Sequence, residues 1–243
     1  MTSVSSTTTP SGITLTEYKF TPSKYVIRIK EIKLHKTDPI SVTPSFDKDN
    51  GTRIYYDENY SEHNIATPIE LSRNNITKPT GAFNYASILI RKDITMNVTA
   101  QFGDGSTYYS PYLTTNNNFA SPPAWIEIPD TSGPAKDVTI NMKYLGSSNL
   151  YPYQYYSSGN IKAVRLDKDK VVATSSSDVS DIFIRFKNPG GPFLITDKLR
   201  FNFNISEITK LASDKWDKWI LDRSEGRPYF KTDFFKLSVS GSV

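Results

Sequence analysis

The sequence predicts an all-β protein: a mainly antiparallel β-sandwich of Greek-key type, with one short helix near residues 213–221. The first observation is strict alternation over residues 86–100, because a strand places successive side chains on opposite faces. Seven of the eight alternate residues there are apolar: Ala86, Ile88, Ile90, Lys92, Ile94, Met96, Val98 and Ala100. The interleaved set contains only Leu89 as an apolar member. This pattern predicts one long strand with a buried face and a solvated face, which is typical of antiparallel sheets.

The second observation is that the same alternation recurs along the chain. It covers residues 138–144, 182–187, 199–205 and 235–239, and several such segments together indicate an all-β fold. In the first strand, Tyr25, Ile27 and Ile29 share one parity, whereas Ile32 and Leu34 share the other. A β-bulge near Lys30 and Glu31 resets the alternation and keeps all five on one face.

The third observation is that turn residues separate these segments. Gly103-Asp104-Gly105 predicts a hairpin between the long strand and residues 106–109. Residues 188–192 predict a tight reversal, and residues 167–169 a turn between strands at 161–166 and 171–174. For the helix, Ser213 is the expected N-cap, and Trp216, Trp219 and Ile220 share one helical face.

Length and composition favour one β-sandwich domain over residues 13–243, preceded by a disordered tether at residues 1–12, which are rich in Ser and Thr. There is no cysteine, which excludes disulfides and cysteine-based sites. The net charge of +4 is mild and dispersed, so we expect no nucleic-acid partner. No run of apolar residues is long enough to cross a bilayer.

Catalytic motifs are absent, so the sequence indicates a non-enzyme with no cofactor. His35 and His63 are the only histidines, and no G-x-S-x-G motif or Gly-rich phosphate loop accompanies them. We interpret both as surface histidines. Glu127, beside Trp125 on an expected strand, is a candidate for glycosidase chemistry. That chemistry needs two carboxylates, and no second acid lies two or four residues away.

Residues 47–58 resemble a calcium loop in part. Asp47, Asp49 and Glu58 match the first, third and twelfth ligand positions, but Thr52 occupies the sixth, where a glycine is needed. Acidic turns use the same residue types for backbone reasons. We therefore expect an ordinary turn and no metal site.

Two tyrosine clusters carry the binding prediction. Tyrosine in loops rich in Ser, Gly and Gln gives a large contact area at low entropic cost, although tyrosine also covers strand edges. The candidate binding residues are Tyr108, Tyr109, Tyr112, Tyr151, Tyr153, Tyr155 and Tyr156.

The order of segments resembles a known group of proteins. A strand at residues 24–34 is followed by the P-x-G-x-aromatic approach Pro79-Thr80-Gly81-Ala82-Phe83, then the long strand, the Asp-Gly turn, a Trp-bearing insert and a last strand. This order is similar to β-sandwich domains, transthyretin-like or immunoglobulin-like, of bacterial surface or periplasmic lipoproteins of unknown function. Fimbrial subunits are a second resemblance. The resemblance implies no catalytic residues, and it implies membrane attachment only through an N-terminal lipid anchor, whose cysteine this chain lacks.

The sequence thus predicts a non-catalytic, exported binding or structural module of a bacterial cell surface (outer-membrane-anchored) or periplasm. Its expected partner is a protein or glycan at the cell surface. Two alternatives stay open: an appendage subunit that assembles by strand donation from residues 1–20, and a carbohydrate-active enzyme that uses carboxylates.

Overall fold

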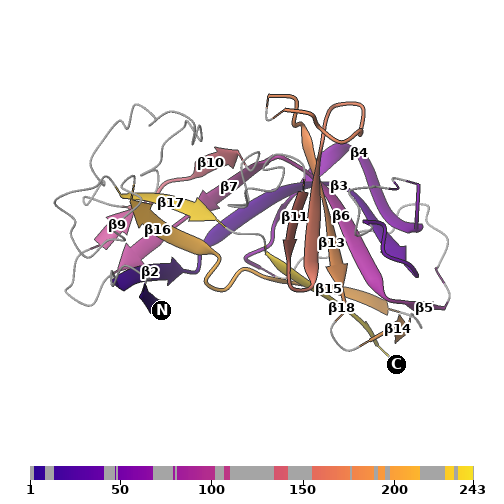
Figure 1. Cartoon of the computed structure of the whole chain (residues 1–243), viewed down its shortest axis with the longest axis horizontal. Helices are drawn as coiled ribbons and strands as arrows, with labels where there is room; N and C mark the ends of the chain where they lie inside the picture. The colour runs from indigo at the N-terminus through magenta and orange to yellow at the C-terminus, as the bar shows by residue number, and fades with distance from the viewer. Residues whose placement is uncertain are drawn as a thin grey trace. The chain divides into compact units, whose positions relative to one another are not determined.

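The fold is known from a computed structural model, which describes residues 3–8, 14–40, 47, 49–67, 79, 81–101, 107–109, 134–141, 155–175, 177–188, 191–194, 198–213, 228–232 and 235–242. Every regular element in these ranges is a β-strand, and every strand pairing given for them is antiparallel, as the sequence predicts (Figure 1). No helix in this part of the chain has the length and hydropathy that crossing a membrane requires.

The residues cluster into two compact units. The first unit comprises Met1–Tyr25, Thr95–Ile140 and Ile205–Phe235, and the second comprises Val26–Ile94, Asn141–Asn204 and Lys236–Val243. The strands mainly in the first unit are β1 (Ser3–Thr8), β2 (Thr14–Phe20), β7 (Asp93–Asn97), β8 (Thr99–Gln101), β9 (Thr107–Tyr109), β10 (Val138–Asn141), β16 (Thr209–Ser213) and β17 (Pro228–Thr232). The single domain expected over residues 13–243 stays a prediction.

In the first unit, four strands pair in the order β1-β2-β16-β17, β7 lies beside β10, and β8 pairs with β9. The β8–β9 pairing agrees with the predicted hairpin, whose turn lies outside the described residues. Residues Ser3–Thr8 lie in the segment expected to be a disordered tether, yet they form β1. Their backbone groups pair with β2 from Ser3 opposite Lys19 to Thr8 opposite Thr14, and this ladder orders a segment that has almost no apolar residues.

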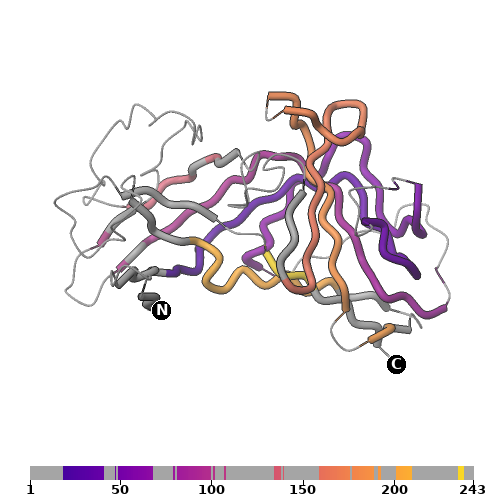
Figure 2. The backbone as a smooth tube through the Cα atoms, in the orientation of Figure 1, coloured from indigo at the N-terminus to yellow at the C-terminus, as the bar shows by residue number. Residues whose placement is uncertain are grey.

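The second unit is built on a sheet in the order β4-β3-β6-β13-β12-β11. Figure 2 traces the backbone of this unit, from indigo in β3 to orange in β12 and β13. Its strands are β3 (Lys24–His35), β4 (Thr52–Asn64), β5 (Ala82–Phe83), β6 (Tyr85–Arg91), β11 (Tyr155–Ser158), β12 (Ile161–Leu166), β13 (Asp181–Lys187), β14 (Phe193–Leu194), β15 (Lys198–Asn204) and β18 (Lys236–Ser242). Strands β5 and β14 form one short pair, and β15 and β18 form another.

The predicted bulge in the first strand is confirmed. Strand β3 shifts register between Ile29 and Glu31 against both of its neighbours, β4 and β6. Tyr25, Ile27, Ile29, Ile32 and Leu34 are all fully buried. The extra residue therefore keeps the apolar side chains enclosed on both sides of the parity switch.

The expected single strand over residues 86–100 is divided into β6, β7 and β8. The residues predicted to face the core are confirmed as buried: Ile88, Ile90, Ile94, Met96 and Val98 are all fully enclosed. Arg91 is exposed, and Asp93, Thr95 and Asn97 are half-buried, as expected of the other face.

The expectation of a wet face is wrong for β6, where Ser87 and Leu89 are also buried. Strand β6 lies between β3 and β13. Because Ser87 and Leu89 are buried as well as Ile88 and Ile90, both faces of the strand are covered. On this second face, Leu89 packs in an apolar cluster with Ile40, Val164, Leu166 and Phe183.

Two further predictions differ from the structure. Residues 171–174 form no strand, because only a single bridge joins Val172 to Leu166. The described residues contain no helix, and Ser213, the expected N-cap, is the last residue of β16, where its backbone pairs with Pro228. The remaining residues of that helix, 214–221, lie outside the described part of the chain.

Candidate functional site

A buried hydrogen-bonded chain links Ser87, His35 and Asn50 in the second unit. The Ser87 Oγ lies 2.7 Å from the Nε2 of His35, and the Nδ1 of His35 lies 3.2 Å from the Oδ1 of Asn50. The amide oxygen of Asn50 can only accept, so Nδ1 carries the proton and Nε2 accepts from the Ser87 hydroxyl. A hydroxyl paired with an oriented imidazole is also the arrangement of an activated nucleophile.

Because these side chains are buried, we interpret their hydrogen bonds as structural. His35 is fully enclosed and Ser87 is 1% exposed, so no substrate reaches the hydroxyl. The ring meets Phe183 edge-on, and a Cβ on Gly51 would overlap the ring at Nδ1. The interpretation of His35 as a surface histidine is therefore wrong. Burial lowers its pKa from 6.5, so the ring is neutral at pH 7.

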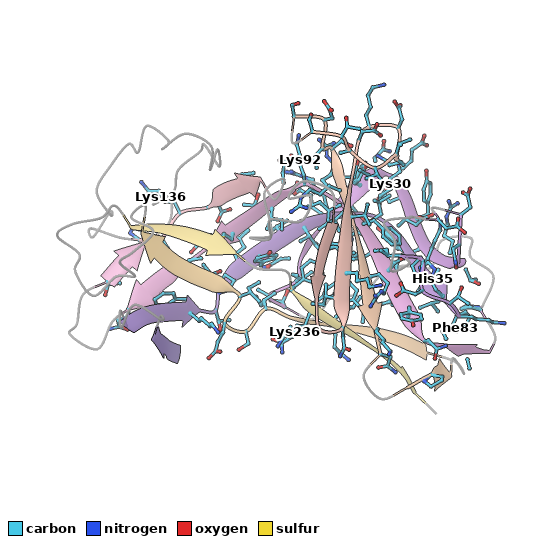
Figure 3. The ribbon with its side chains drawn as sticks, in the orientation of Figure 1. Lys30, His35, Phe83, Lys92, Lys136 and Lys236 are labelled. Atoms are coloured by element: carbon cyan, nitrogen blue, oxygen red, sulfur yellow. The ribbon has the colours of Figure 1, made fainter. Side chains whose placement is uncertain are left out.

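A second cluster combines aromatic rings and cations. Its residues are Lys30, Arg53, Tyr56, Tyr60, Arg91 and Lys170, which we call the Tyr60 surface. Strand β4 supplies Tyr56 and Tyr60, while Lys30 and Arg91 come from strands β3 and β6. Lys170 lies in the connection between β12 and β13. Figure 3 labels Lys30 together with Lys92, His35 and Phe83 of the same unit.

The rings hold the cations close together. The Tyr60 ring has Lys30 Nζ 5.0 Å, Arg91 Cζ 5.4 Å and Lys170 Nζ 5.8 Å from its centroid. The Tyr56 ring has Arg53 Cζ at 4.4 Å and is 42% exposed. The negative face of an aromatic ring offsets the repulsion between like charges near it. Within the described part of the chain, Lys30 and Arg91 form no ion pair.

The buried carboxylate of Asp181 anchors this surface. Its Oδ1 accepts from the Tyr60 hydroxyl at 2.5 Å, and its Oδ2 accepts from Lys170 Nζ at 2.5 Å and from the Ser180 hydroxyl. Tyr60 and Lys170 both have positive φ, 60° and 63°, which bulky residues rarely adopt. The backbone is therefore strained at the two positions that meet at Asp181, a condition often found at binding sites.

The pKa shifts agree with this geometry. Burial, followed by the hydrogen bond to Asp181, raises the pKa of Tyr60, so its hydroxyl stays protonated and donates. Burial opposes the charge on Lys170, but its hydrogen bonds to Asp181 and Tyr60 outweigh that effect and raise its pKa. Lys170 is thus cationic at neutral pH. Close to Asp181 in the chain, the backbone carbonyl of Val179 accepts a hydrogen bond from Lys92 Nζ at 2.6 Å.

The predicted tyrosine sites are distributed over both units. Tyr108 and Tyr109 belong to β9 of the first unit, whereas Tyr155 and Tyr156 belong to β11 of the second. These four lie on strands and not in loops. Tyr112, Tyr151 and Tyr153 fall outside the described residues. The binding role of the seven tyrosines stays a prediction.

The calcium segment forms a turn and a strand. The Asp47 carboxylate accepts the backbone N–H groups of Asp49 and Asn50 at 3.0 and 3.2 Å, while Glu58 lies within β4. The described ranges contain no group of three or more metal-binding side chains. Glu127 and Trp125, the residues of the glycosidase alternative, lie outside those ranges.

Sequence reasoning missed the Tyr60 surface because its parts are far apart in the chain. Tyr60 and Asp181 are separated by 121 positions, and no local spacing links them. One available signal was the run Tyr55-Tyr56-Asp57-Glu58-Asn59-Tyr60, which places three tyrosines in a polar strand. Searches found no matching family model, no matching curated protein and no matching solved structure.

Proposed function

We propose that the chain is a non-catalytic binding module and that the Tyr60 surface binds an anionic glycan. The observation that supports this most is the convergence of Lys30, Arg91 and Lys170 on one tyrosine ring. Of these three, only Lys170 has a carboxylate partner among the described residues. A patch with uncompensated positive charge attracts anions, and exposed aromatic rings add contact area for sugar rings.

Rigidity supports a binding role further. The Asp181 carboxylate accepts hydrogen bonds from Tyr60 and Lys170 and so fixes both side chains. Arg53 donates to Glu31 Oε1 at 2.6 Å while it lies over Tyr56. Charged side chains that are already held in place lose less entropy when a ligand binds. The six residues of the Tyr60 surface orient positive charge and aromatic faces, and this arrangement favours recognition over catalysis.

Export to a bacterial cell surface or periplasm is part of this proposal, and it rests on the resemblance in segment order described above. The antiparallel, helix-free character of the described residues is consistent with it. Fractionation of the source cells tests the location: recovery with the envelope or periplasm supports it, and recovery with the cytosol contradicts it.

The test of binding compares dextran sulfate with uncharged dextran. Wild-type protein should bind dextran sulfate, more weakly as salt rises, and should ignore dextran. Arg91→Ala should weaken binding roughly tenfold, equivalent to about 1.4 kcal/mol. Lys187→Ala is the matched control, because it removes one exposed charge at the far end of β13 from Asp181. Equal losses in both variants would contradict a localised site.

A further inference from the structure

Asn50 and Gly51 form the only Asn-Gly dipeptide in the chain, and they lie directly before strand β4. In such a dipeptide the backbone nitrogen of the glycine can attack Cγ of the asparagine side chain, because the glycine has no Cβ to block the approach. The two reacting atoms belong to adjacent residues, so the attack closes a ring within the chain and avoids the entropic cost of bringing separate reactants together. The surroundings of the dipeptide then decide how fast the ring closes.

The attacking nitrogen is exposed and unpaired. Gly51 is exposed to solvent, and its N–H forms no hydrogen bond within the described part of the chain. Hydroxide from the solvent can therefore remove the amide proton. Asn50 is half-buried: its backbone N–H donates to the Asp47 carboxylate at 3.2 Å, and its Nδ2 donates to Thr37 Oγ1 at 3.3 Å. These two contacts restrict the conformations that the reacting side chain samples.

His35 contacts the oxygen on which negative charge would develop. Its Nδ1 carries the proton and lies 3.2 Å from Asn50 Oδ1, and its Nε2 accepts from the Ser87 hydroxyl at 2.7 Å, which fixes the tautomer. When the Gly51 nitrogen adds to Cγ, Oδ1 becomes the negative oxygen of a tetrahedral intermediate. A fixed N–H donor aimed at that oxygen stabilises the intermediate more than the starting amide. Because the His35 ring is fully buried, water does not compete for the donor.

Packing explains why a reactive dipeptide is kept at this position. A Cβ on residue 51 would overlap Nδ1 and Cε1 of His35, and the φ of +100° is one that residues with side chains rarely adopt. Residue 51 is therefore required to be glycine for structural reasons. The same requirement removes the steric protection that a larger residue would give to Asn50.

We propose that Asn50 is a site of spontaneous deamidation and that His35 promotes the reaction. The Gly51 nitrogen loses its proton and forms a bond to Asn50 Cγ, the bond from Cγ to the side-chain nitrogen breaks, and that nitrogen leaves as ammonia. Water then opens the resulting succinimide at either of its two carbonyls, which gives aspartate or isoaspartate. The sequence of steps consumes one water, releases one ammonia and oxidises or reduces nothing.

The product would change the charge beside a buried ring. Either opening replaces the neutral amide next to His35 with a carboxylate, and a neighbouring negative charge favours the protonated imidazole. The pKa of His35, followed by NMR titration of its ring resonances, should therefore be higher in Asn50→Asp than in the wild-type chain. Deamidation would thus act as a slow, irreversible change in the acid response of the second unit. None of these residues belongs to the Tyr60 surface, so the outcome is independent of the glycan proposal.

The first test follows the asparagines by peptide mapping and mass spectrometry after incubation of the whole chain at mildly alkaline pH. Asn59 is the internal control, because it is exposed, its backbone N–H also donates to an aspartate, Asp57 at 2.9 Å, and Tyr60 follows it. Asn50 should convert at least about ten times faster than Asn59, to both aspartate and isoaspartate. Equal rates at the two positions, or no conversion at Asn50, would overturn the proposal.

The role of His35 is tested without a variant by comparing the native chain with the chain unfolded in urea at the same pH. Unfolding removes the His35 donor but keeps the Asn-Gly sequence. Deamidation at Asn50 should therefore be about tenfold slower in the unfolded chain. A faster reaction in urea would mean that the fold protects Asn50, and would contradict the role assigned to His35.

Two substitutions separate the donor from the packing of the ring. His35→Asn keeps an amide N–H near the position of Nδ1, whereas His35→Gln extends toward Ser87 and leaves Asn50 without that donor. Deamidation should be about tenfold slower in His35→Gln and closer to the wild-type rate in His35→Asn, with circular dichroism to check that both are folded. Equal rates in the two folded variants would contradict the proposal. If either variant is unfolded, the comparison of native and unfolded wild-type chain decides the role of His35.

Discussion

Individual buried side chains in the second unit differ in how their polar and charged groups are paired. His35 is neutral and bonded on both sides, between Ser87 and Asn50. Asp181 is enclosed but accepts three donors. Arg165 is the exception in the described part of the chain, with two unpartnered donors. The cost of an unpaired buried group, about 1–3 kcal/mol or more when charged, explains why the first two are paired.

The neutral state of His35 makes stability depend on pH. Burial lowers its pKa below 6.5, so the unfolded chain binds a proton before the folded chain does. The stability that the neutral ring contributes is present above pH 6.5 and is lost as pH falls through 6.5 toward the lowered pKa. Denaturant titrations between about pH 7.5 and about pH 5 should show this decline, with a slope that approaches at most about 1.4 kcal/mol per pH unit for one proton.

His63 provides the control for that titration. Burial also lowers its pKa, but the residue is only half-buried. His63→Gln should therefore keep most of the acid decline, and His35→Gln should flatten it. An unchanged slope in His35→Gln would show that the buried imidazole is not its source.

Gly51 should resist substitution for two separate reasons. Its φ is +100°, and a Cβ would overlap the His35 ring and lie 2.9 Å from the Leu34 carbonyl oxygen. Gly51→Ala should lower the free energy of unfolding by about 1–3 kcal/mol from backbone strain, with the clash adding to it. Gly159→Ala is the matched control, since φ is +56° there and no atom lies within 4 Å of the new Cβ. Chemical denaturation of the two variants should therefore give a clearly larger loss at Gly51.

At the scale of elements, strand β6 explains both a success and a failure of sequence reasoning. The parity of Ile88 and Ile90 was readable because side-chain alternation is local. The burial of Leu89 could not be predicted in the same way, because it depends on Ile40, Val164 and Phe183 from distant segments. The bulge in β3 could be predicted for the same reason as the buried face of β6. A switch in the parity of the apolar residues is a local feature of consecutive positions.

Ile90 tests the packing of this strand. It is fully buried, between Ile29 of β3 and Ile182 of β13. Ile90→Ala should reduce the free energy of unfolding by about 2–5 kcal/mol through lost burial and the cavity that remains. Lys187→Ala, an exposed position on β13, should change it by less than about 0.5 kcal/mol. Comparable losses in the two variants would contradict the core assignment.

For the whole molecule, the proposed function rests on contacts that join distant parts of the sequence. The alternating pattern predicted antiparallel strands, but not that Tyr60 would meet Asp181 across 121 positions or that His35 would meet Ser87 across 52. Such pairings follow from strand order, which a single sequence encodes only weakly. The tyrosine clusters were visible because they are contiguous, whereas the Tyr60 surface was assembled by the fold.

The most direct test of the binding proposal is an amide ¹H–¹⁵N NMR titration of the whole chain with a sulfated dextran oligosaccharide. Uncharged dextran should produce no shifts, whereas the sulfated oligosaccharide should produce saturable shifts concentrated at Lys30, Arg53, Tyr56, Tyr60, Arg91 and Lys170. Shifts centred on Tyr108, Tyr109, Tyr155 or Tyr156 would assign binding to the tyrosine clusters instead. Such a result, or the absence of localised shifts, would contradict the proposal that the Tyr60 surface binds the ligand.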